Sequence, residues 1–271
     1  MSSPPPIVVA FAASDPTGGA GLQADTVTLA ALGCHPASVV TALTAQDTRG
    51  VEAVLPIDSA WVERQAERLL ADLPVAAFKL GVLGSAGNAR AIARMLARYP
   101  KAPVVLDPVL ASGRGDALAD DEALRAIREA LLPLATVLTP NSLEARRLAG
   151  AAPDAPLEDC ARALVQAGCK YVLVTGTHEA GKQVLNTLHG PRGVVREDRW
   201  ERLPGSYHGS GCTLASALAA FLARGMDVAA AAREAEDYTW RVLASGFRAG
   251  KGQRLPNRVF NEAARPLRDH A

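Results

Sequence analysis

The sequence predicts an α/β fold in which helices cover both faces of a mainly parallel central sheet. Short apolar runs such as residues 7–13 (IVVAFAA) are typical of strands that are buried on both faces of a parallel sheet. Each run ends in a polar break, and a segment of helical periodicity follows after a short connection. No internal repeat or long linker interrupts this alternation, which favours one continuous α/β arrangement.

Short apolar runs bounded by polar residues are predicted to form the strands of the sheet. In chain order they are 7–13, 37–45, 76–80, 104–106, 136–139 and 171–175. Residues 51–57 (VEAVLPI) alternate only weakly and are predicted to form an exposed strand or flap. Residues 181–203 change to short alternating segments around Gly190 and Gly193, which suggests hairpins.

Helices are predicted between the strands from capping residues and from the glycines or prolines that end them. Gly33 ends the first helix, Asp58-Ser59 caps the second, and Pro100 stops the third. Ser142 is expected to cap a later helix, and Gly168 closes the one after it. The expected helices are 20–32, 59–70, 88–99, 121–132, one from 142, 157–167, one from about 210, and 227–244.

Length and composition limit the class of protein. A chain of 271 residues suits one large α/β domain or two small ones. We expect a single domain over residues 7–271 behind a flexible tail of residues 1–6. With 29 basic and 28 acidic residues, the totals carry no electrostatic footprint for nucleic acid or an anionic membrane.

Cysteine usage and hydropathy indicate a cytoplasmic protein. Cys34, Cys160, Cys169 and Cys212 are widely separated and form no Cys-x-x-Cys motif, so free thiols in a reducing compartment are expected. The first six residues contain no basic residue, which argues against a signal peptide. No uncharged apolar run reaches the length of about 18 residues that a membrane span requires.

A glycine-bearing loop, Gly209-Ser210-Gly211-Cys212, leads directly into an alanine- and leucine-rich helical segment. Ser210 is expected to cap this helix. Backbone N–H groups and the helix dipole then converge at the loop, which is the usual arrangement of a phosphate or anion site. Cys212 lies at its mouth, where a thiolate is stabilised. Taken alone, Gly-Ser-Gly favours an ordinary loop-to-helix junction.

Polar residues follow most of the predicted strands. Each of them taken alone fits a cap or a turn. In a parallel sheet, however, the carboxyl ends of the strands meet at one edge, where ligands bind. The residues at these ends are Asp15, Gln46, Asp107, Asn141 with Glu144, and Thr175. Asp107, Asn141 and Glu144 together could hold a hard cation such as Mg²⁺, directly or through water.

Several ordered blocks resemble the hydroxymethylpyrimidine/phosphomethylpyrimidine kinases of thiamine biosynthesis, which are members of the ribokinase superfamily. The blocks are residues 13–25 (ASDPTGGAGLQAD), 42–48 (ALTAQDT), 79–83 (KLGVL), 106–109 (LDPV), 138–141 (LTPN) and 208–214 (HGSGCTL). This resemblance covers nearly the whole chain. It implies a ribokinase-like three-layer sandwich, ATP and Mg²⁺, and a homodimer. The implied reaction phosphorylates 4-amino-5-hydroxymethyl-2-methylpyrimidine and then its monophosphate to the diphosphate.

The resemblance also implies a role for each site residue. Cys212 stands where sugar kinases of the superfamily carry an aspartate base, and a pKa lowered by the helix N-terminus would suit it to that role. The catalytic set is Cys212 with the anion hole of Gly209, Ser210 and Gly211. The substrate set is Gln46, Asp25, Gly21, Val82 and Asp15. The nucleotide set is Asn141, Thr175, Thr177, Gly209 and Gly211, and the metal set is Asp107 and Glu144.

Two of these residues have further arguments from their chemistry. The Gln46 amide both donates and accepts, which fits the edge of an aminopyrimidine. Asp25 lies on the first predicted helix one turn beyond Gly21, near the substrate by resemblance. The alternative for Asp25 is a carboxylate on the helix surface.

Departures from the family pattern leave other functions open. The family commonly has Met-Lys-Gly-Gly-His where this chain has residues 174–178 (VTGTH), so Thr175 replaces a lysine that would face ATP phosphates. Lys182 could substitute if its loop folds inward. Val82 stands where methionine is common, and residues 250–257 depart from the family's Gly-His-Gly-x-Gly-Pro. One alternative is a pyridoxal-type vitamin kinase, and another is a non-catalytic pyrimidine-binding protein.

Overall fold

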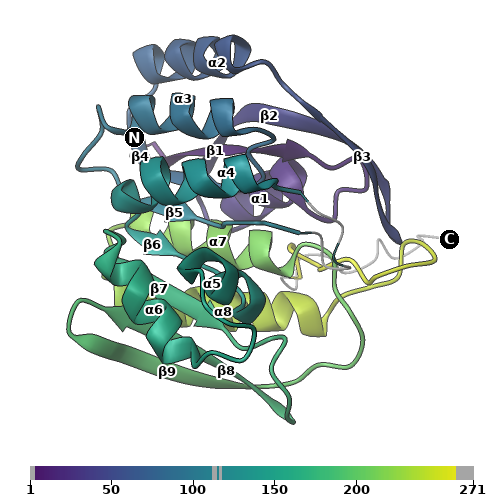
Figure 1. Ribbon diagram of the computed structural model, residues 1–271. Helices are drawn as coiled ribbons and strands as arrows, with labels where there is room; N and C mark the ends of the chain where they lie inside the picture. The colour runs from purple at the N-terminus through teal and green to yellow at the C-terminus, as the bar shows by residue number, and fades with distance from the viewer. Residues whose placement is uncertain (1–3, 112–114, 116–117, 261–271) are drawn as a thin grey trace, which may run out of the picture.

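The computed structural model describes residues 4–111, 115 and 118–260. They form three layers around one central sheet with the strand order β3-β2-β1-β4-β5-β6-β7-β8-β9 (Figure 1). The strands are β1 (Ile7–Ser14), β2 (His35–Asp47), β3 (Gly50–Pro56), β4 (Val75–Leu80), β5 (Val104–Leu106), β6 (Val137–Leu138), β7 (Tyr171–Thr175), β8 (Gln183–Gly190) and β9 (Gly193–Glu201).

The central strands β2, β1, β4, β5, β6 and β7 run parallel to one another, as the sequence predicts. Leu80 pairs with Leu106, and Leu106 pairs with Leu138. These pairs align the carboxyl ends of three neighbouring strands, so the residues after them emerge at the same edge. The outer strands β3, β8 and β9 pair antiparallel with their neighbours. The segments predicted as a flap and as hairpins therefore form the two margins of the sheet.

Helices cover both faces of the sheet, which confirms the predicted three-layer sandwich. One face carries α2 to α6 and the other carries α1, α7 and α8 (Figure 1). The helices are α1 (Gly21–Ala31), α2 (Ser59–Asp72), α3 (Ala86–Leu96), α4 (Asp121–Ala126), α5 (Ser142–Ala149), α6 (Leu157–Gln166), α7 (Ser210–Ala223) and α8 (Val228–Ala244). Alternating strand residues explain this arrangement, since Val9 and Phe11 face the first layer and Val8 faces the second.

Several boundaries differ from those the sequence predicts. β2 begins at His35 and continues to Asp47. Its last residues pair with β3 in a hairpin that extends beyond the end of β1. The predicted helix 121–132 is α4, followed by a π-helical turn over Ile127–Leu131 and a 3-10 turn over Leu132–Leu134. Pro133 lies in that last turn, and a proline cannot continue an α-helix.

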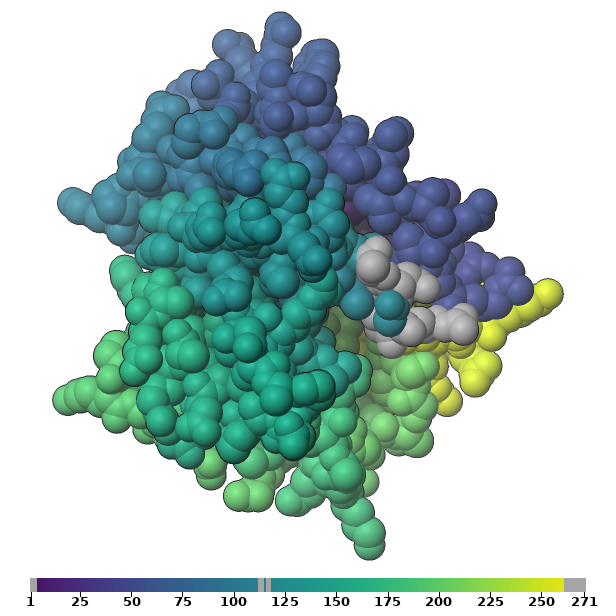
Figure 2. Space-filling model, viewed as in Figure 1, coloured from purple at the N-terminus to yellow at the C-terminus, as the bar shows by residue number. Residues whose placement is uncertain are grey.

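The C-terminal segment crosses back over the polar edge of the sheet. Phe247 pairs with Leu255, and Tyr207 pairs with Arg254. The N–H groups of Gly252 and Gln253 donate to Thr48 at the tip of the β2–β3 hairpin. Figure 2 shows this segment, in yellow, against the blue-violet hairpin. Residues more than 200 positions apart in the chain, such as Thr48 and Gly252, are therefore in contact at this edge.

The predicted tail and termini are only partly within the described ranges. Residues 1–3 of the expected N-terminal tail and residues 261–271 of the expected domain lie outside the described residues. Within the described ranges, no helix has both the length and the apolar character that crossing a membrane would demand. Cys34, Cys160, Cys169 and Cys212 are all free and buried.

Candidate active site

The glycine loop begins helix α7 by a route that only glycine adopts easily. Gly209 precedes the helix with φ +76°, in the left-handed region. A Cβ on Gly209 would lie 2.0 Å from the carbonyl oxygen of Gly19, so the two segments meet without space for a side chain. Gly209, rather than the predicted Ser210, is the N-cap residue, and Ser210 is the first helical residue. That expectation was wrong because the cap position here requires the positive φ angle.

The first turn of α7 leaves backbone donors facing the polar edge. The N–H of Thr213 donates to Gly209 O at 3.0 Å, and this is the first bond of the helix. The N–H groups of residues 210–212 have no acceptor within the helix, as is usual at a helix N-terminus. They also carry the positive end of the helix dipole. The loop therefore has the donors and the electrostatics of a phosphate site.

Asp107, which directly follows β5, lies opposite this helix start. A Cβ on Gly211 would lie 3.7 Å from each carboxylate oxygen of Asp107. The side chain is buried, and its Oδ2 atom has no hydrogen-bond partner among the described residues. Burial raises the pKa of Asp107 to about 6, although the charge of Lys79 opposes the shift. An unpaired carboxylate oxygen beside an anion site is a ready ligand for a cation.

Glu144 is the second buried acid on this side of the cleft. Its Oε2 accepts from the N–H of Asn141 at 3.0 Å, and its Oε1 accepts from Leu110 N–H at 3.2 Å. Asn141 in turn caps α5 through its Oδ1, which completes a capping box. The cap is therefore Asn141 and not the predicted Ser142. Burial, followed by the charge of Asp107, raises the pKa of Glu144 to about 7.

These two acids fit the magnesium ion that the family implies. Mg²⁺ prefers oxygen ligands and is commonly held by one or two carboxylates together with water and substrate phosphates. Within the described ranges, no group of three or more His, Cys, Asp or Glu side chains could hold a metal without such help. The unpaired Oδ2 of Asp107 supplies an open ligand position. Glu144 can contribute through water while its oxygens serve the capping box.

Beneath the loop lies a fully buried ion pair. Lys79 and Asp25 both have 0% exposure, and Lys79 Nζ lies 2.8 Å and 3.0 Å from the two carboxylate oxygens. Ser216 Oγ donates to Asp25 Oδ1 at 2.8 Å. The alternative that Asp25 is a surface carboxylate is therefore wrong. Because no surface of Asp25 is exposed, direct contact with a substrate is not open to it in this structure.

Cys212 lies on α7 one helical turn before Ser216, the residue that donates to Asp25. The Cys212 side chain is almost completely buried. The expectation of a lowered pKa was wrong. Burial raises the pKa of the Cys212 thiol to about 12, and the charges of Asp107 and Asp25 raise it further. Lys79 and the Gly21 backbone act in the opposite direction. The helix N-terminus alone does not compensate for removing the sulfur from water.

Asp15 organises the N-terminal loop and connects it to the glycine loop. Its carboxylate accepts from Thr17 N–H at 2.8 Å and from Ala20 N–H at 2.7 Å. His208 Nε2 lies 2.8 Å from Asp15 Oδ2. Burial raises the pKa of Asp15, but hydrogen bonds from His208, Gln46 and Thr17 outweigh burial, so the pKa lies well below its usual value. Asp15 therefore stays charged and ties residues 15–20 to the glycine loop.

Gln46 lies at the same junction. It is half-buried near the end of β2, and its Nε2 is 3.5 Å from His208 Nε2. Gly21 begins α1 with φ +59°, and a Cβ there would lie 2.3 Å from Ala13 O. Its glycine identity therefore follows from backbone packing. Val82 is half-buried, and its carbonyl accepts from Thr41 Oγ1.

The predicted nucleotide residues after β7 are less enclosed. Thr175 pairs with Asn141 as an isolated parallel bridge, and its N–H donates to Pro140 O at 3.0 Å. Thr177 is exposed, and Arg202 donates to its carbonyl at 2.7 Å. Lys182 is also exposed in this structure. Thr177 is thus exposed to solvent, unlike the buried side chains of Asp107, Glu144 and Cys212.

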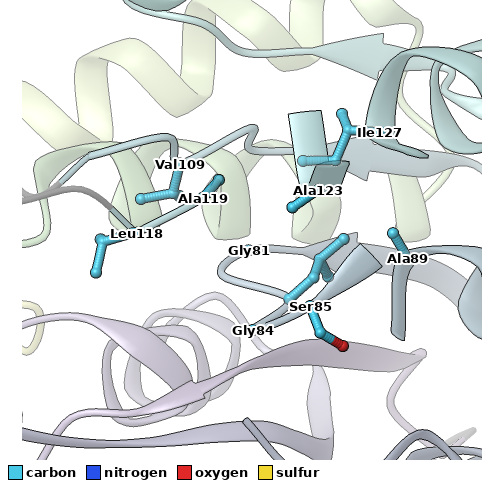
Figure 3. A pocket seen from close by; sticks show the side chains of 10 residues that line it. Gly81, Gly84, Ser85, Ala89, Val109, Leu118, Ala119, Ala123 and Ile127 are labelled. Carbon is cyan, nitrogen blue, oxygen red and sulfur yellow. The ribbon is translucent and has the colours of Figure 1, made fainter. Parts of the chain in front are cut away.

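A small hollow lies beside the cleft but contains none of the predicted site residues. It is formed where the loop after β4 meets the start of α4, and Figure 3 shows Ala123 and Ile127 on one side of it and Gly84 and Ser85 on the other. Its lining is mostly apolar, and Gly81 and Gly84 form part of its wall. The chemistry described above is instead at the strand ends and the helix start.

Comparisons with known proteins identify the family to which this chain belongs. Residues 15–257 match the family model described as phosphomethylpyrimidine kinase. The chain belongs to this family. It is 42% identical over 256 residues to a hydroxymethylpyrimidine/phosphomethylpyrimidine kinase of Streptomyces coelicolor, with 92% of each chain covered.

Solved structures give the same result for the fold. A phosphomethylpyrimidine kinase from Clostridium difficile 630 is 32% identical with a TM-score of 0.75, covering 86% of this chain and 97% of its own. An ADP complex of a Bacillus subtilis pyridoxal kinase is 26% identical with a TM-score of 0.83, covering 94% and 97%. The ribokinase-like fold predicted from the sequence is therefore confirmed.

Three residues at the site received no role from the sequence. Lys79 could have been noticed as a charged residue inside the apolar strand run AAFKL. His208 is part of the glycine-loop block, but its partner Asp15 lies 193 positions away. Arg258 contacts three glycine carbonyls, and no local pattern indicates this.

Proposed function

We propose that this chain transfers the γ-phosphoryl group of ATP to the hydroxymethyl group of 4-amino-5-hydroxymethyl-2-methylpyrimidine and then a second one to the resulting monophosphate. As a member of its family, the chain is a hydroxymethylpyrimidine/phosphomethylpyrimidine kinase of thiamine biosynthesis. One observation carries the site assignment. The unpaired oxygen of Asp107 and the first turn of α7 face each other, which places a cation ligand beside a phosphate site.

Phosphoryl transfer depends mainly on positioning and charge stabilisation. The N–H groups of Ser210, Gly211 and Cys212 would hold the transferring phosphoryl group, and Gly209 provides the turn that aims them. Asp107, with Glu144 through water, would hold Mg²⁺. When bound, Mg²⁺ neutralises phosphate charge and fixes the phosphates in one geometry. Asn141, Thr175 and Thr177 line the nucleotide side.

Cys212 is the proposed base for the substrate hydroxyl. Burial keeps its thiol protonated at neutral pH even though the charge of Lys79 opposes this, so the role requires a further lowering of the Cys212 pKa when the substrates bind. Cys212→Ala is expected to reduce kcat about 100- to 10,000-fold while nucleotide binding persists. The measurement combines steady-state kinetics with calorimetric titration of ADP. Normal turnover by the variant would remove Cys212 from the role and leave Asp107 as the candidate base.

The substrate side is formed by Gln46, Val82 and the loop that Asp15 and Gly21 shape. Gln46 and His208 offer donors and acceptors for the amino and ring nitrogen atoms of the pyrimidine. Asp25, fully buried against Lys79, supports the site from below.

The deciding experiment is a product assay that separates mono- from diphosphorylated pyrimidine. Purified protein with the pyrimidine, ATP and Mg²⁺ is expected to yield both products and ADP. Folded protein that yields neither would overturn the proposal. Asp107→Asn keeps the shape of the side chain but removes its charge, and it should raise the Mg²⁺ concentration required for half of the maximal rate.

A pyridoxal-type kinase is the second candidate, because the chain resembles a pyridoxal kinase with a TM-score of 0.83. Parallel assays with pyridoxal and the pyrimidine distinguish the two. The non-catalytic alternative rests on Thr175 in place of lysine, and calorimetry that detects the pyrimidine but no adenine nucleotide would favour it.

We further propose a homodimer that works in the cytoplasm. The four cysteines are all free, as in proteins of reducing compartments. The dimer would cover the outer face of the β2–β3 hairpin, where Leu43 pairs with Leu55 and both side chains are exposed. An edge strand with exposed apolar residues is a natural surface for a second copy.

A further inference from the structure

Arg258 is a buried arginine whose guanidinium group binds backbone carbonyls. The residue is 5% exposed. Its Nη1 donates to Gly18 O at 3.3 Å, and its Nη2 donates to Gly19 O and, at 3.4 Å, to Gly209 O. Its Nε donates to Thr213 Oγ1 at 3.0 Å. All four of its hydrogen bonds with described residues therefore end on neutral oxygens.

A buried cation held by neutral groups alone is costly. Arginine cannot lose its proton at physiological pH, and burial without a carboxylate partner removes its hydration. The residue is nevertheless fixed from both sides: Tyr238 Oη donates to its carbonyl at 2.7 Å, and Asn257 N–H donates to Val242 O at 3.1 Å. The surrounding structure thus fixes the backbone from which the Arg258 side chain reaches the glycine carbonyls.

The reason lies in the contact between the two glycine segments. Gly19 O approaches Gly209 so closely that a Cβ there would lie 2.0 Å away. The carbonyls of Gly19 and Gly209 both point toward Arg258. Carbonyl dipoles that converge with their negative ends together repel each other, and a guanidinium group between them removes this repulsion.

These carbonyls also set the direction of the peptide N–H groups at the site. In a trans peptide the C=O and the following N–H point in opposite directions. Gly209 O accepts the first bond of α7 from Thr213 N–H at 3.0 Å and also accepts from Arg258 at 3.4 Å. The N–H of Ser210 is directed away from both donors, to the side where the first turn of α7 is open. On the other segment, the N–H that follows Gly19 O belongs to Ala20 and donates to Asp15 at 2.7 Å.

We propose that Arg258 is a positioning residue for the phosphate-binding loop, because its guanidinium group holds the Gly18–Gly19 and Gly209 peptides in the orientation that presents the α7 N–H groups to the transferring phosphoryl. The inference rests on the proposed kinase function. Because Arg258 is buried, it acts through these backbone groups. It lies one residue beyond the part of the chain that matches the family model.

The test compares Arg258→Ala, Arg258→Met and Arg254→Ala. Arg254 lies on the same segment, but its side chain donates to Gly246 O and to none of the glycine carbonyls that Arg258 binds. Its backbone bonds beside Tyr207 do not depend on the side chain, so Arg254→Ala is the matched control. Arg258→Ala is expected to lower kcat about 100- to 1,000-fold, in the range seen when an anion-hole donor is lost, with a smaller change in the KM for the pyrimidine. Arg254→Ala should retain kcat within about threefold of wild type.

Chemical rescue distinguishes positioning from general stability. Guanidinium chloride, at concentrations well below those that unfold the chain, should restore part of the kcat of Arg258→Ala with saturation. Urea at the same concentrations should not, and Arg254→Ala should not respond. Arg258→Met preserves the apolar volume and should fold with low kcat even if Arg258→Ala does not.

Three results would overturn the inference: kcat within twofold of wild type in Arg258→Met, loss of activity that matches the unfolded fraction, or no saturable rescue of a folded Arg258→Ala. Failure of the proposed function has a different signature, since wild-type protein itself would then not turn over. In that case the affinity for ADP, measured by calorimetry on wild type and Arg258→Met, reports on the loop. Equal affinities would count against the inference.

Discussion

Lys79 shows how strongly the interior can change the role of a single residue. Its side chain is fully buried within β4, and its charge faces Asp25, Asp107 and Cys212. Burial lowers the pKa of Lys79, but the nearby groups, above all the Asp25 carboxylate, outweigh burial and raise it above its usual value. Lys79 therefore remains a cation, and it is the positive charge that offsets the buried acids under the glycine loop.

Removing one partner of this ion pair should be far more costly than removing both. Lys79→Met leaves the Asp25 carboxylate buried and uncompensated, and it should destabilise the fold by about 3–5 kcal/mol. The double variant with Asp25→Asn should recover most of this loss. Urea unfolding of the single and double variants measures it, with exposed Lys101→Met as the control expected within about 0.5 kcal/mol of wild type.

Recovery of stability need not restore activity. If the ion pair supports Cys212 as proposed, the double variant should fold and still turn over slowly. A double variant as active as wild type would show that the pair has a purely structural role. A single variant as stable as wild type would contradict the burial argument itself.

At the scale of one element, helix α7 has a glycine at each end with positive φ. Gly209 begins it at φ +76° and Gly225 follows its end at φ +87°. A Cβ on Gly225 would meet nothing within 4 Å, whereas a Cβ on Gly209 would collide with Gly19 and Ala20. The two positions therefore share backbone strain and differ in steric environment.

Gly209→Ala and Gly225→Ala form a matched pair. Gly225→Ala should cost about 1–2 kcal/mol from the φ angle alone and leave kcat unchanged. Gly209→Ala should in addition displace the glycine loop and reduce kcat by at least about 100-fold. Kinetics together with thermal unfolding tests this pair. Equal kcat values in the two variants would mean that contact with Gly19 does not position the loop.

Helix α8 carries a buried acid that links it to the end of β7. Glu236 Oε2 accepts from Trp200 Nε1 at 2.6 Å and from Asn186 Nδ2 at 3.1 Å. Asn186 Oδ1 then accepts from Gly176 N–H at 3.3 Å, beside Thr175. Burial raises the pKa of Glu236 from 4.5 to about 7, despite these hydrogen bonds.

This raised pKa predicts a pH dependence of stability with a definite sign. Between the two pKa values the folded chain keeps the proton that the unfolded chain has lost, so stability is greatest below the unfolded value and falls as pH rises through about 7. Glu236→Gln should lack this fall. Relative to the variant, wild type should lose on the order of 1–3 kcal/mol between about pH 5 and pH 8.

Urea unfolding at several pH values measures this difference. Glu234→Gln, an exposed change on the same helix, is the control and should follow wild type. The raised pKa values of Asp107 and Glu144 also make stability fall as pH rises. Both residues are present in wild type and in each variant, so their contributions cancel when the unfolding free energies are compared. Parallel curves for wild type and Glu236→Gln would show that Glu236 does not titrate in this range.

At the scale of the whole molecule, the two edges of the sheet differ in chemistry. β3 exposes Leu55 at 63% and has Glu52 as its charged residue, while its neighbour β2 exposes Leu43 at 44%. The other edge, β9, is rich in charged residues over its second half (REDRWE). Charges on an edge strand discourage pairing with another chain, so β3 is the edge more suited to self-association.

Leu55→Glu should therefore shift the proposed dimer to monomer without unfolding it. Val194→Glu, at a position 49% exposed on the opposite edge, is the matched control and should leave the assembly unchanged. Light scattering coupled to size-exclusion chromatography measures the mass. A wild-type monomer, or a dimer that survives Leu55→Glu, would contradict the proposed interface.

Much of this protein could be predicted from its sequence because the relevant signals are local. Apolar runs, helix ends and polar residues at strand ends lie within a few positions of one another, so they predicted the sheet, the layers and the positions of Asp107 and Glu144. The ordered blocks also predicted the family. The Ser210 and Ser142 caps were wrong, because cap choice depends on the φ angle at one residue and on a bond to Glu144.

Tertiary structure decided the electrostatics of the site. The raised pKa of Cys212 follows from how many atoms surround the sulfur, which the neighbouring sequence does not specify. The Lys79–Asp25 pair joins positions 54 residues apart, and Arg258 joins segments about 240 residues apart. Burial, long-range charge and converging carbonyls arise only when the chain is folded. The sequence by itself therefore determined the fold and the family, whereas the packed structure decided which groups are charged and what holds the glycine loop in place.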